Sequence, residues 1–369
     1  MSKIKKQIIV VGAGASGLGI GVVLKKMNLD FLILERKTVG HSFKLWTKET
    51  KFISPSFTGN FFQMPDLNAI TPDSSPAYNL LTEHPSGKEY SAYLKQVASH
   101  FDLPVKENTD VMFVKKIKDK FLIKTTKGAV ECDFLIWAGG EYQYPNMNVF
   151  EGANLCLHSS KIKAYKNIKE DDLIIIGAYE SGMDAAIQLS KLGKKVTVLD
   201  AGDEINNVVS DSSYALSPYT RDRLKEGVKF IITSNSRVLS VSKKQDYYVI
   251  KTKNKTYRTK AKPIVATGFS SSLVLVKDLF DFENHVLLTN NDESTKTKNL
   301  FLVGPQVRHD SAIFCFIYKF RQRFAVVAEV IARRLKKNNS DEVKEVLKYY
   351  KDYNFYLKDL SCCGDSCAC

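Results

Sequence analysis

The chain of 369 residues contains one sequence unit twice, and this repeat constrains the fold more than any other feature. Each copy has an apolar, β-branched run, a glycine-containing turn, an amphipathic stretch and a second apolar run that ends in an acid. The copies span residues 8–35 and 172–200, and the first glycine precedes the acid by 23 residues in both (35 − 12 and 200 − 177). A strand–turn–helix–strand unit of this kind is typical of one half of a dinucleotide-binding sheet. The repeat therefore predicts an α/β fold that holds two dinucleotides.

Each part of the first copy has a physical role in binding a dinucleotide. Gly12 allows a tight turn, Gly14 lets the backbone approach a pyrophosphate, and Gly17 lets helix and strand pack closely. The unpaired N–H groups of the helix N-terminus face the phosphates, and the acid at Glu35 can accept hydrogen bonds from a ribose. The first predicted binding set is Gly12, Ala13, Gly14, Ala15, Ser16, Gly17, Glu35 and Arg36.

The second copy departs from this pattern at one position. Tyr179 replaces the middle glycine, so the backbone cannot approach a pyrophosphate as closely, and weaker or differently posed binding follows. The acid at Asp200 favours a free ribose 2′-hydroxyl, and no arginine directly follows it to bind a 2′-phosphate. We therefore expect NADH to be preferred. The second predicted set is Gly177, Tyr179, Glu180, Ser181, Gly182 and Asp200.

Between the copies lies a long segment, residues 39–86, with few helix signals. Its apolar side chains argue against disorder; they are Trp46, Phe52, Phe57, Phe61, Phe62 and Met64. We interpret the segment as a cover over one side of the cofactor pocket, with Trp46 as a contact. The alternative is that these aromatic residues only cover the core.

Several helices are predicted outside the repeated units. Ser86 and Glu89 form a capping box ahead of a helix, and Ser217 caps a short helix that ends near Gly227. A long helix is expected over residues 314–337. A last helix, capped by Asn339 and running to about residue 360, completes the prediction.

Composition is that of an ordinary globular enzyme, with 44% apolar and 25% charged residues. The net charge of +14 is high, but lysines are spread in short clusters without a nucleic-acid motif, so no nucleic-acid partner is expected.

The N-terminal lysines mimic a signal peptide, yet the glycines and the strand beyond them argue against one. We expect no signal peptide, no membrane span and a cytoplasmic protein. The six histidines lack ligand spacing, so no metal site is predicted.

The seven cysteines fall into two groups. Cys132, Cys156 and Cys315 lie in apolar contexts and are interpreted as buried thiols. The last eight residues contain the other four, and these are the predicted catalytic residues: Cys362, Cys363, Cys367 and Cys369. Thiolates on a tail can exchange disulfides or bind soft metals. An inert or regulatory tail is the alternative.

These features together resemble the two-dinucleotide flavoprotein superfamily, which includes flavin-containing monooxygenases and thioredoxin-reductase-like enzymes. The resemblance covers residues 7 to about 337. It implies two Rossmann-like three-layer domains of ββα/βαβ type, with the NAD(P)-binding domain inserted into the FAD-binding domain. The expected boundaries are 1–165 and 276–337 for FAD, 166–275 for NAD(P), and 338–369 for a C-terminal helix and Cys-rich tail.

The resemblance also assigns the two fingerprints. The first implies FAD and the second implies a nicotinamide cofactor. Further cofactor contacts are expected at the turns that cross between the domains and beside the flavin: Ala138, Gly139, Thr267, Gly268 and Gly304. No C-x-x-C or C-x4-C pair lies in the cofactor domains, so the dithiol common in this superfamily is missing.

The expected activity is transfer of hydride from NAD(P)H to FAD, and then of electrons to a thiol, disulfide or soft metal(loid) acceptor. The tail cysteines resemble the C-terminal pair of some relatives and are expected to relay the electrons. A monooxygenase that holds a flavin C4a-hydroperoxide, or a redox-sensing flavin-binding protein, are the alternatives. A small-molecule or small-protein electron acceptor and a homodimer are expected as partners.

Overall fold

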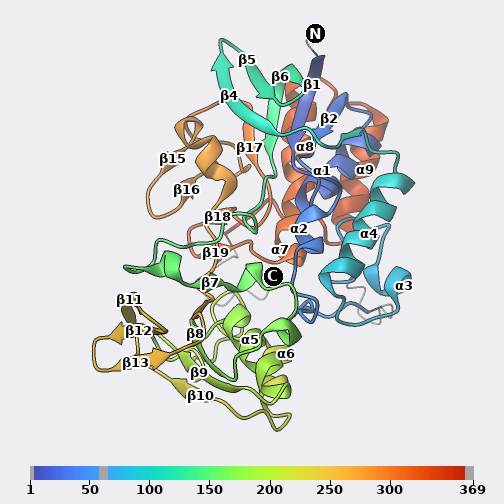
Figure 1. Ribbon diagram of the computed structural model, residues 1–369. Coiled ribbons are helices and arrows are strands. Elements are labelled where there is room, and N and C mark those ends of the chain that lie inside the picture. Colours follow the sequence, from blue (N-terminus) through green and yellow to red (C-terminus); the bar gives the residue numbers. More distant parts are fainter. Residues whose placement is uncertain (1–3, 58–64, 362–369) are drawn as a thin grey trace.

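The structure, a computed structural model, describes residues 4–57 and 65–361. It is divided into two α/β units, which lie one above the other in Figure 1. The upper unit contains the first fingerprint and the last helices of the chain, and the lower unit contains the second fingerprint. The predicted α/β fold with two Rossmann-type units is confirmed.

The first sheet has seven strands, and its parallel part carries the first fingerprint. In spatial order they are β3 (Val105–Lys106), β2 (Phe31–Leu34), β1 (Ile4–Val11), β6 (Gly128–Trp137), β5 (Lys120–Thr125) and β4 (Val111–Ile117), with β17 (Leu300–Leu302) also paired to β6. β1 pairs in parallel with β2 and β6, whereas β4, β5 and β6 form an antiparallel meander. The two strands predicted for the first copy are therefore present as β1 and β2.

The second sheet is parallel and carries the second fingerprint. Its order is β10 (Ile231–Thr233), β9 (Lys195–Leu199), β8 (Asp172–Ile176), β14 (Ile264–Val265) and β7 (Leu157–His158). A separate antiparallel sheet follows the order β11 (Val238–Lys244), β12 (Tyr247–Thr252) and β13 (Thr256–Thr259). Two short hairpins complete the strands: β15 (Asp281–Phe282) with β16 (Val286–Leu287), and β18 (Arg308–His309) with β19 (Ala312–Ile313).

The helices pack around these sheets. The α-helices are α1 (Ala15–Lys26), α2 (His41–Lys44), α3 (Pro76–Leu80), α4 (Gly87–His100), α5 (Glu180–Lys191), α6 (Pro218–Leu224), α7 (Ile317–Phe320), α8 (Phe324–Arg334) and α9 (Asp341–Asp352). Short 3-10 turns span Ala153–Leu155, Ser159–Lys161, Tyr165–Asn167, Ser272–Leu275, Lys277–Leu279 and Arg321–Arg323. A Cβ atom on Gly19 would lie 2.2 Å from the ring of Phe324, so this glycine lets α1 pack closely on α8. In the described ranges, none of the helices combines the length and apolar character needed to cross a bilayer.

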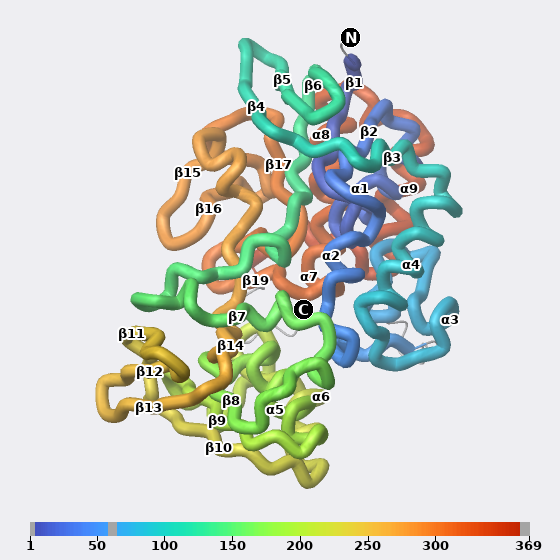
Figure 2. Tube along the Cα trace, in the orientation of Figure 1, coloured from blue at the N-terminus to red at the C-terminus, as the bar shows by residue number. Residues whose placement is uncertain are grey.

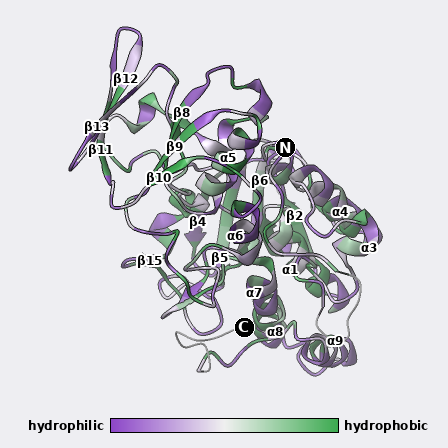
Figure 3. Ribbon diagram, turned by 90° about the horizontal axis from the view of Figure 1, so that it is seen from below, coloured by the Kyte–Doolittle hydropathy of each residue, from purple (hydrophilic) through white to green (hydrophobic). Residues whose placement is uncertain are grey.

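The chain crosses between the two units twice, as Figure 2 shows near β7 and beyond β14. β7 lies before residue 165 but pairs with β14 in the second sheet. β17 returns to the first sheet beside β6. Figure 3 shows the hydrophobic residues concentrated on central strands such as β2 and β9, where the cores of the two units lie.

The predicted continuous helix over residues 314–337 is wrong. The segment divides into α7, a 3-10 turn over Arg321–Arg323, and α8. The tight turn places two buried guanidinium groups: Arg321 donates to backbone carbonyl oxygens of the 66–69 segment, and Arg323 pairs with the fully buried Asp292. These partners lie far away in the sequence, so local periodicity could not reveal the break.

The last helix is also shorter than predicted. Its N-cap is Ser340, not Asn339, because the Ser340 hydroxyl accepts a hydrogen bond from the backbone N–H of Val343. The helix ends at Asp352, and the following chain packs Phe355 into the core. The capping box of Ser86 and Glu89 and the Ser217 cap are both present as predicted.

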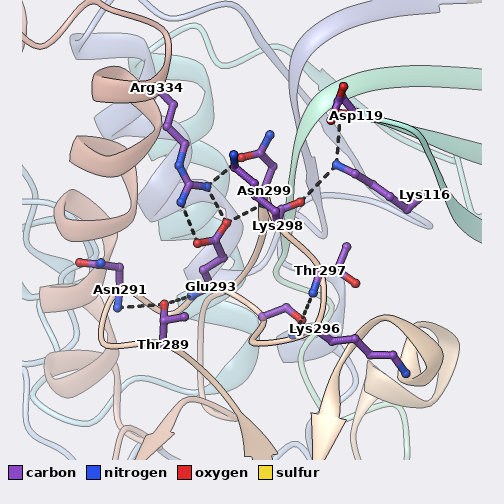
Figure 4. A network of polar contacts seen from close by, with 11 residues as sticks. Lys116, Asp119, Thr289, Asn291, Glu293, Lys296, Thr297, Lys298, Asn299 and Arg334 are labelled. Carbon is purple, nitrogen blue, oxygen red and sulfur yellow. Dashed lines mark hydrogen bonds and ion pairs between the residues drawn. The ribbon is translucent and has the colours of Figure 1, made fainter.

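A polar network fixes the segment that leads into β17. Both terminal guanidinium nitrogens of Arg334 on α8 donate to the carboxylate of Glu293, at 2.5 and 2.8 Å (Figure 4). The N–H of Asn299 donates to the same carboxylate at 2.6 Å, and Lys116 of β4 donates to the carbonyl oxygen of Lys298 at 3.1 Å. The network holds β17 against the first sheet and thereby positions the turn that follows it.

Candidate functional site

The two glycine turns have the same geometry, so the sequence repeat is also a structural repeat. Gly12 follows β1 with φ of +106°, and Gly177 follows β8 with φ of +108°; both values favour glycine. A Cβ atom would lie 2.5 Å from the carbonyl oxygen of Ala138 in the first turn and 2.5 Å from that of Ala266 in the second. Each turn therefore lies at the carboxyl end of its parallel sheet, where α/β folds bind ligands.

Gly14 leaves open space in front of helix α1. It is the N-cap residue in an extended conformation, and it provides no side-chain cap for the first N–H groups. A Cβ atom added to Gly14 would meet no other atom within 4 Å. Open space beside unpaired helix N–H groups fits a pyrophosphate, so the residues of the first turn fit the predicted FAD.

Glu35 ends the first copy with a buried carboxylate. Oε2 accepts a hydrogen bond from the N–H of Ala13 at 2.8 Å, and Oε1 accepts one from the N–H of Lys37 at 2.7 Å. Because an ionised carboxylate can accept about four hydrogen bonds, acceptor capacity remains for ribose hydroxyls. Arg36, also in the predicted set, lies beside Tyr144.

A cavity of about 400 Å³ lies between the two fingerprints. The predicted residues on its wall are Gly12, Gly14, Ala15, Ser16, Glu35, Trp46, Ala138, Gly139, Glu180 and Ser181. Residues of both copies thus face one space, which is the arrangement needed for two cofactors to meet. The other predicted residues are not on this wall: Ala13, Gly17, Arg36, Gly177, Tyr179, Gly182, Asp200, Thr267, Gly268 and Gly304.

Two of the residues that do not line the cavity, Gly17 and Gly304, allow close packing beside residues that do. A Cβ atom on Gly17 would lie 1.8 Å from the carbonyl oxygen of Gly12, so glycine is required inside the turn. Gly304 has φ of +109°, and a Cβ atom there would lie 2.5 Å from Ser16 Oγ. Thr267 instead donates its hydroxyl proton to the carbonyl oxygen of Asn146.

In the second turn, the side chain of Tyr179 occupies the space in front of the helix, and the loop of residues 212–217 covers it. The hydroxyl of Tyr179 forms hydrogen bonds with the carbonyl oxygens of Ser212 and Ala215. Glu180, in the first turn of α5, accepts hydrogen bonds from the N–H of Ser217 and the hydroxyl of Thr220, both at 2.5 Å. The segment 212–217 therefore lies against the N-terminus of α5.

Asp200 lies at the end of β9, as the sequence predicts, but its carboxylate is held by its own loop. It is buried, and it accepts hydrogen bonds from the N–H groups of Gly202 at 3.2 Å and Glu204 at 2.7 Å. As with Glu35, acceptor capacity remains for a ribose. The backbone of Gly177 and Gly182 and the acid fit a second dinucleotide, whereas Tyr179 narrows the approach of its pyrophosphate.

The aromatic segment between the copies is folded and lies on the cavity wall. Phe43, Trp46 and Phe52 contact one another with ring centroids 4.9 to 5.8 Å apart, and Phe52 packs on Tyr90 of α4 at 4.4 Å. Trp46 and Phe52 both line the cavity, so these rings contribute to core and pocket together. Phe57 is exposed. Phe61, Phe62 and Met64 lie outside the described residues.

A polar contact joins the two units at the edge of the cavity. The hydroxyl of Thr50 donates to Asp184 Oδ2 at 2.7 Å, and Arg223 donates to Asp184 Oδ1 at 2.6 Å. All three residues line the cavity. Nearby, burial raises the pKa of Tyr165 well above its ordinary value. The sequence did not identify this contact, because Thr50 and Asp184 lie on different units and are 134 residues apart in the chain.

One prediction about cysteines is wrong. Cys132 and Cys156 are buried as expected, and burial raises their thiol pKa values, that of Cys156 to about 12. Cys315 is instead exposed and lines the cavity, because the backbone ahead of α7 turns Phe314 inward and Cys315 outward. The predicted catalytic residues Cys362, Cys363, Cys367 and Cys369 lie outside the described residues.

Other functional candidates were also missed. Glu141 lines the cavity directly after the Ala138–Gly140 turn, and burial raises the pKa of its carboxyl group. Its position next to a predicted crossing turn was a signal that could have identified it. Cys315 lies in the first turn of the helix predicted over residues 314–337, ten residues beyond Pro305 (315 − 305), and offered no such signal.

Comparison with known proteins agrees with this geometry. Residues 9–304 match the family described as pyridine nucleotide-disulphide oxidoreductase. The oxidoreductase CzcO of Bacillus velezensis is 32% identical over 200 residues, 52% of this chain and 53% of that protein. Bacilliredoxin reductase Bdr of Bacillus subtilis is 27% identical over 202 residues, 54% of this chain and 59% of that protein. The chain thus spans slightly more than half the length of these relatives.

Solved structures show the same fold. Bacillithiol disulfide reductase Bdr (YpdA) of Staphylococcus aureus has a TM-score of 0.73 at 23% identity, covering 90% of this chain and 99% of that one. A flavin-containing monooxygenase of Stenotrophomonas maltophilia has a TM-score of 0.65 at 17% identity, covering 94% and 99%.

The family match extends over most of the chain and includes both fingerprints. It confirms the predicted superfamily and the expectation of an oxidoreductase, and it implies FAD and NAD(P)H as cofactors. The chain belongs to the pyridine nucleotide-disulphide oxidoreductase family.

Proposed function

We propose that the protein is an FAD-dependent NAD(P)H oxidoreductase whose electron acceptor is a disulfide or another thiol-bound species. The observation that carries this proposal is the single cavity lined by residues of both fingerprints, Gly14 and Ser16 from one and Glu180 and Ser181 from the other. Bound FAD would accept a hydride from the nicotinamide and hold two electrons for the acceptor. The chain's own contribution is to bind and orient the two cofactors within this cavity.

Each group has a distinct task in this arrangement. The N–H groups at the start of α1 would bind the FAD pyrophosphate, and Glu35 would bind its ribose. The aromatic rings of Trp46 and Phe52 would exclude water from one side of the cavity. Asp184, held between Thr50 and Arg223, would fix the distance between the two units.

The choice of a disulfide acceptor has two supports. The relative Bdr is named for reduction of bacilliredoxin, and the structurally similar Bdr is named for reduction of bacillithiol disulfide. The chain itself places Cys315 on the cavity wall and carries four cysteines in its last eight residues. We include the tail cysteines in the proposal as a relay to larger acceptors, including soft metal ions bound by thiols.

An anaerobic turnover experiment tests this function. Purified protein with FAD is mixed with NADH or NADPH, and bleaching of the flavin absorbance is measured before low-molecular-weight disulfides are added. We expect bleaching, followed by reoxidation with two thiols formed for each nicotinamide oxidised. A protein that binds no FAD, or whose reduced flavin is not reoxidised by any added disulfide, would contradict the proposal.

A truncated variant tests the tail. Deleting residues 362–369 should leave the reduction of FAD by NADH unchanged, because the hydride path between the two fingerprints does not include them. Turnover with a protein disulfide should be lost if the tail is the relay. Undiminished turnover with every acceptor would remove the tail from the proposal.

A further inference from the structure

Cys315 is the one exposed cysteine among the described residues, and its exposed surface faces the cavity. It lines the same cavity as Gly14 and Ser16 of the first fingerprint and Glu180 and Ser181 of the second. A substrate that enters between the two units therefore meets this thiol. Cys132 and Cys156, in contrast, are buried in the cores.

The thiol belongs to a polar cluster contributed by both units. Cys315 Sγ lies 3.2 Å from the hydroxyl oxygen of Ser213, which also accepts a hydrogen bond from Lys319 Nζ at 2.9 Å. Lys319 is anchored by both carboxylate oxygens of Asp211, at 2.7 and 2.6 Å. A hydroxyl can accept from the ammonium group and donate to a thiolate at the same time. Ser213 thus connects the positive charge of Lys319 to the sulfur.

The pKa of Cys315 reflects opposing effects. Although part of the residue is exposed to the cavity, the protein groups around the sulfur desolvate it and raise the pKa, as do the charges of Asp211 and Glu141. The Ser213 hydrogen bond and the Lys319 ammonium lower the pKa, and the net result lies above the ordinary value. A thiol of this kind needs a group that removes its proton when it attacks.

Glu141 supplies such a group on the same cavity wall. Its carboxylate accepts a hydrogen bond from the side-chain amide of Gln306, which follows the turn after β17. Burial raises the pKa of Glu141, although Gln306 and Arg308 act in the other direction. Its charge also acts on Cys315, so the two groups lie within electrostatic reach of each other. A carboxyl group with a raised pKa is better suited to accept and return a proton than one at its ordinary value.

We propose that Cys315 is a catalytic thiol, that Glu141 relays its proton, and that the cavity binds a low-molecular-weight disulfide as substrate. The inference rests on the proposed function and deepens it by naming the substrate class and the reacting atom. In the first step Cys315 Sγ attacks one sulfur of R–S–S–R. The disulfide bond breaks, Cys315–S–S–R forms, and the thiol proton passes through Glu141 to the leaving sulfur, so R–SH departs. Two electrons and two protons from the NAD(P)H-driven reaction then release the second R–SH and restore the thiol.

The first step can be tested without any turnover. The full-length protein is incubated anaerobically with oxidised glutathione and no NAD(P)H, quenched in acid, digested with trypsin and analysed by mass spectrometry. The peptide of residues 309–319 contains Cys315 and no other cysteine, so it is distinguished from the tail peptide and from those of Cys132 and Cys156. We expect a mass gain of one glutathionyl group on this peptide. Its absence at a disulfide concentration that supports turnover would overturn the proposal.

Two cysteine variants test whether the thiol of Cys315 is the one that reacts. Cys315→Ser should lower disulfide-dependent NAD(P)H oxidation at least about tenfold. The matched control Cys156→Ser, which changes a thiol away from the cavity wall, should leave this rate unchanged. Flavin content and thermal unfolding are measured for both, so that misfolding is recognised. A Cys315→Ser variant that folds, binds FAD and keeps the wild-type rate would refute the assignment. If the wild-type protein itself fails to reduce FAD, the proposed function fails instead.

Two disulfides with different leaving groups distinguish proton transfer by Glu141 from a purely structural role of this residue. With an alkyl disulfide, whose leaving thiolate must be protonated, Glu141→Gln should slow adduct formation on Cys315 by about 100-fold. With 5,5′-dithiobis(2-nitrobenzoic acid), whose aromatic thiolate leaves without a proton, the effect should be at most about threefold. Equal slowing with both disulfides would show that Glu141 only shapes the cavity, and no slowing would exclude it from the reaction.

Discussion

Gly14 and Tyr179 occupy equivalent positions with the same backbone conformation. Their φ and ψ angles are −87° and −167° for Gly14, and −88° and −171° for Tyr179. Each is the N-cap residue of the helix that follows its glycine turn. The two dinucleotide units thus differ at this point only in the side chain. In the first unit the space in front of the helix is open, and in the second it holds a phenol ring.

The first prediction concerns that open space. Gly14→Val should abolish FAD binding while the protein stays folded, because the extended backbone accepts any residue and a Cβ atom there would meet no other atom within 4 Å. Flavin absorbance after purification and thermal unfolding are the measurements. Gly19→Val is the contrast: its side chain would collide with Phe324, so stability should fall by about 1–3 kcal/mol. Normal FAD content in Gly14→Val would refute the assignment of the first fingerprint.

The second prediction concerns the phenol ring. Tyr179→Gly should open the approach to α5 and strengthen binding of NADH about tenfold, which corresponds to ~1.4 kcal/mol. Tyr179→Phe keeps the ring and removes only the hydrogen bonds to Ser212 and Ala215, so its affinity should stay close to that of the wild type. Titration of the NADH fluorescence measures both. Weaker binding in Tyr179→Gly would mean that Tyr179 contacts the cofactor directly.

The repeat predicted the two dinucleotide units because their turns and strands depend on residues that are close together in the sequence. The turn at Gly12 and the strand that ends before Glu35 depend on φ angles and on β-branched runs that the sequence shows directly. The cover over the second turn could not be predicted in this way. Tyr179 and Ser212 are 33 residues apart, and their contact depends on how a loop without periodicity folds back.

The residues that line the cavity could likewise be predicted only where a local sequence motif identifies them. Fingerprint residues such as Ser16 and Ser181 were identified because their spacing carries the motif. Cys315 was placed incorrectly because an apolar sequence context predicts burial, whereas the two buried arginines at positions 321 and 323 set the path of the segment. Tertiary partners of this kind leave no periodic signal in the chain.

The third prediction is a preference for NADH over NADPH of about tenfold in kcat/KM. A carboxylate at Asp200 would accept hydrogen bonds from ribose hydroxyls and would repel a 2′-phosphate. Asp200→Asn should reduce the preference, because the amide has no negative charge. Gly202 and Glu204 donate to different oxygens of Asp200, so the variant keeps an acceptor for only one of these two N–H groups. Steady-state rates with each cofactor measure this. A tenfold preference for NADPH in the wild type would refute the ribose argument.

The fourth prediction concerns stability at low pH and the ion pair of Glu293 with Arg334 in Figure 4. Burial alone would raise the pKa of Glu293, but hydrogen bonds from Arg334 and the N–H of Asn299 outweigh it, so the pKa lies below its ordinary value of 4.5. A carboxyl group whose pKa is lowered by folding stabilises the protein above its unfolded pKa, and this contribution is lost as the pH falls through the folded pKa.

Glu293→Gln should therefore lower the free energy of unfolding by about 1–3 kcal/mol at neutral pH, because Arg334 loses its charged partner. The difference between variant and wild type should shrink as the pH falls below 4.5 and through the lowered pKa of the folded state, where the wild-type carboxylate becomes protonated as well. Urea unfolding at several pH values measures this. Glu226→Gln is the matched control, since Glu226 pairs with Lys191 on the surface and its loss should cost less than about 1 kcal/mol. A difference for Glu293→Gln that stays constant with pH would show that the network in Figure 4 acts through shape and not through charge.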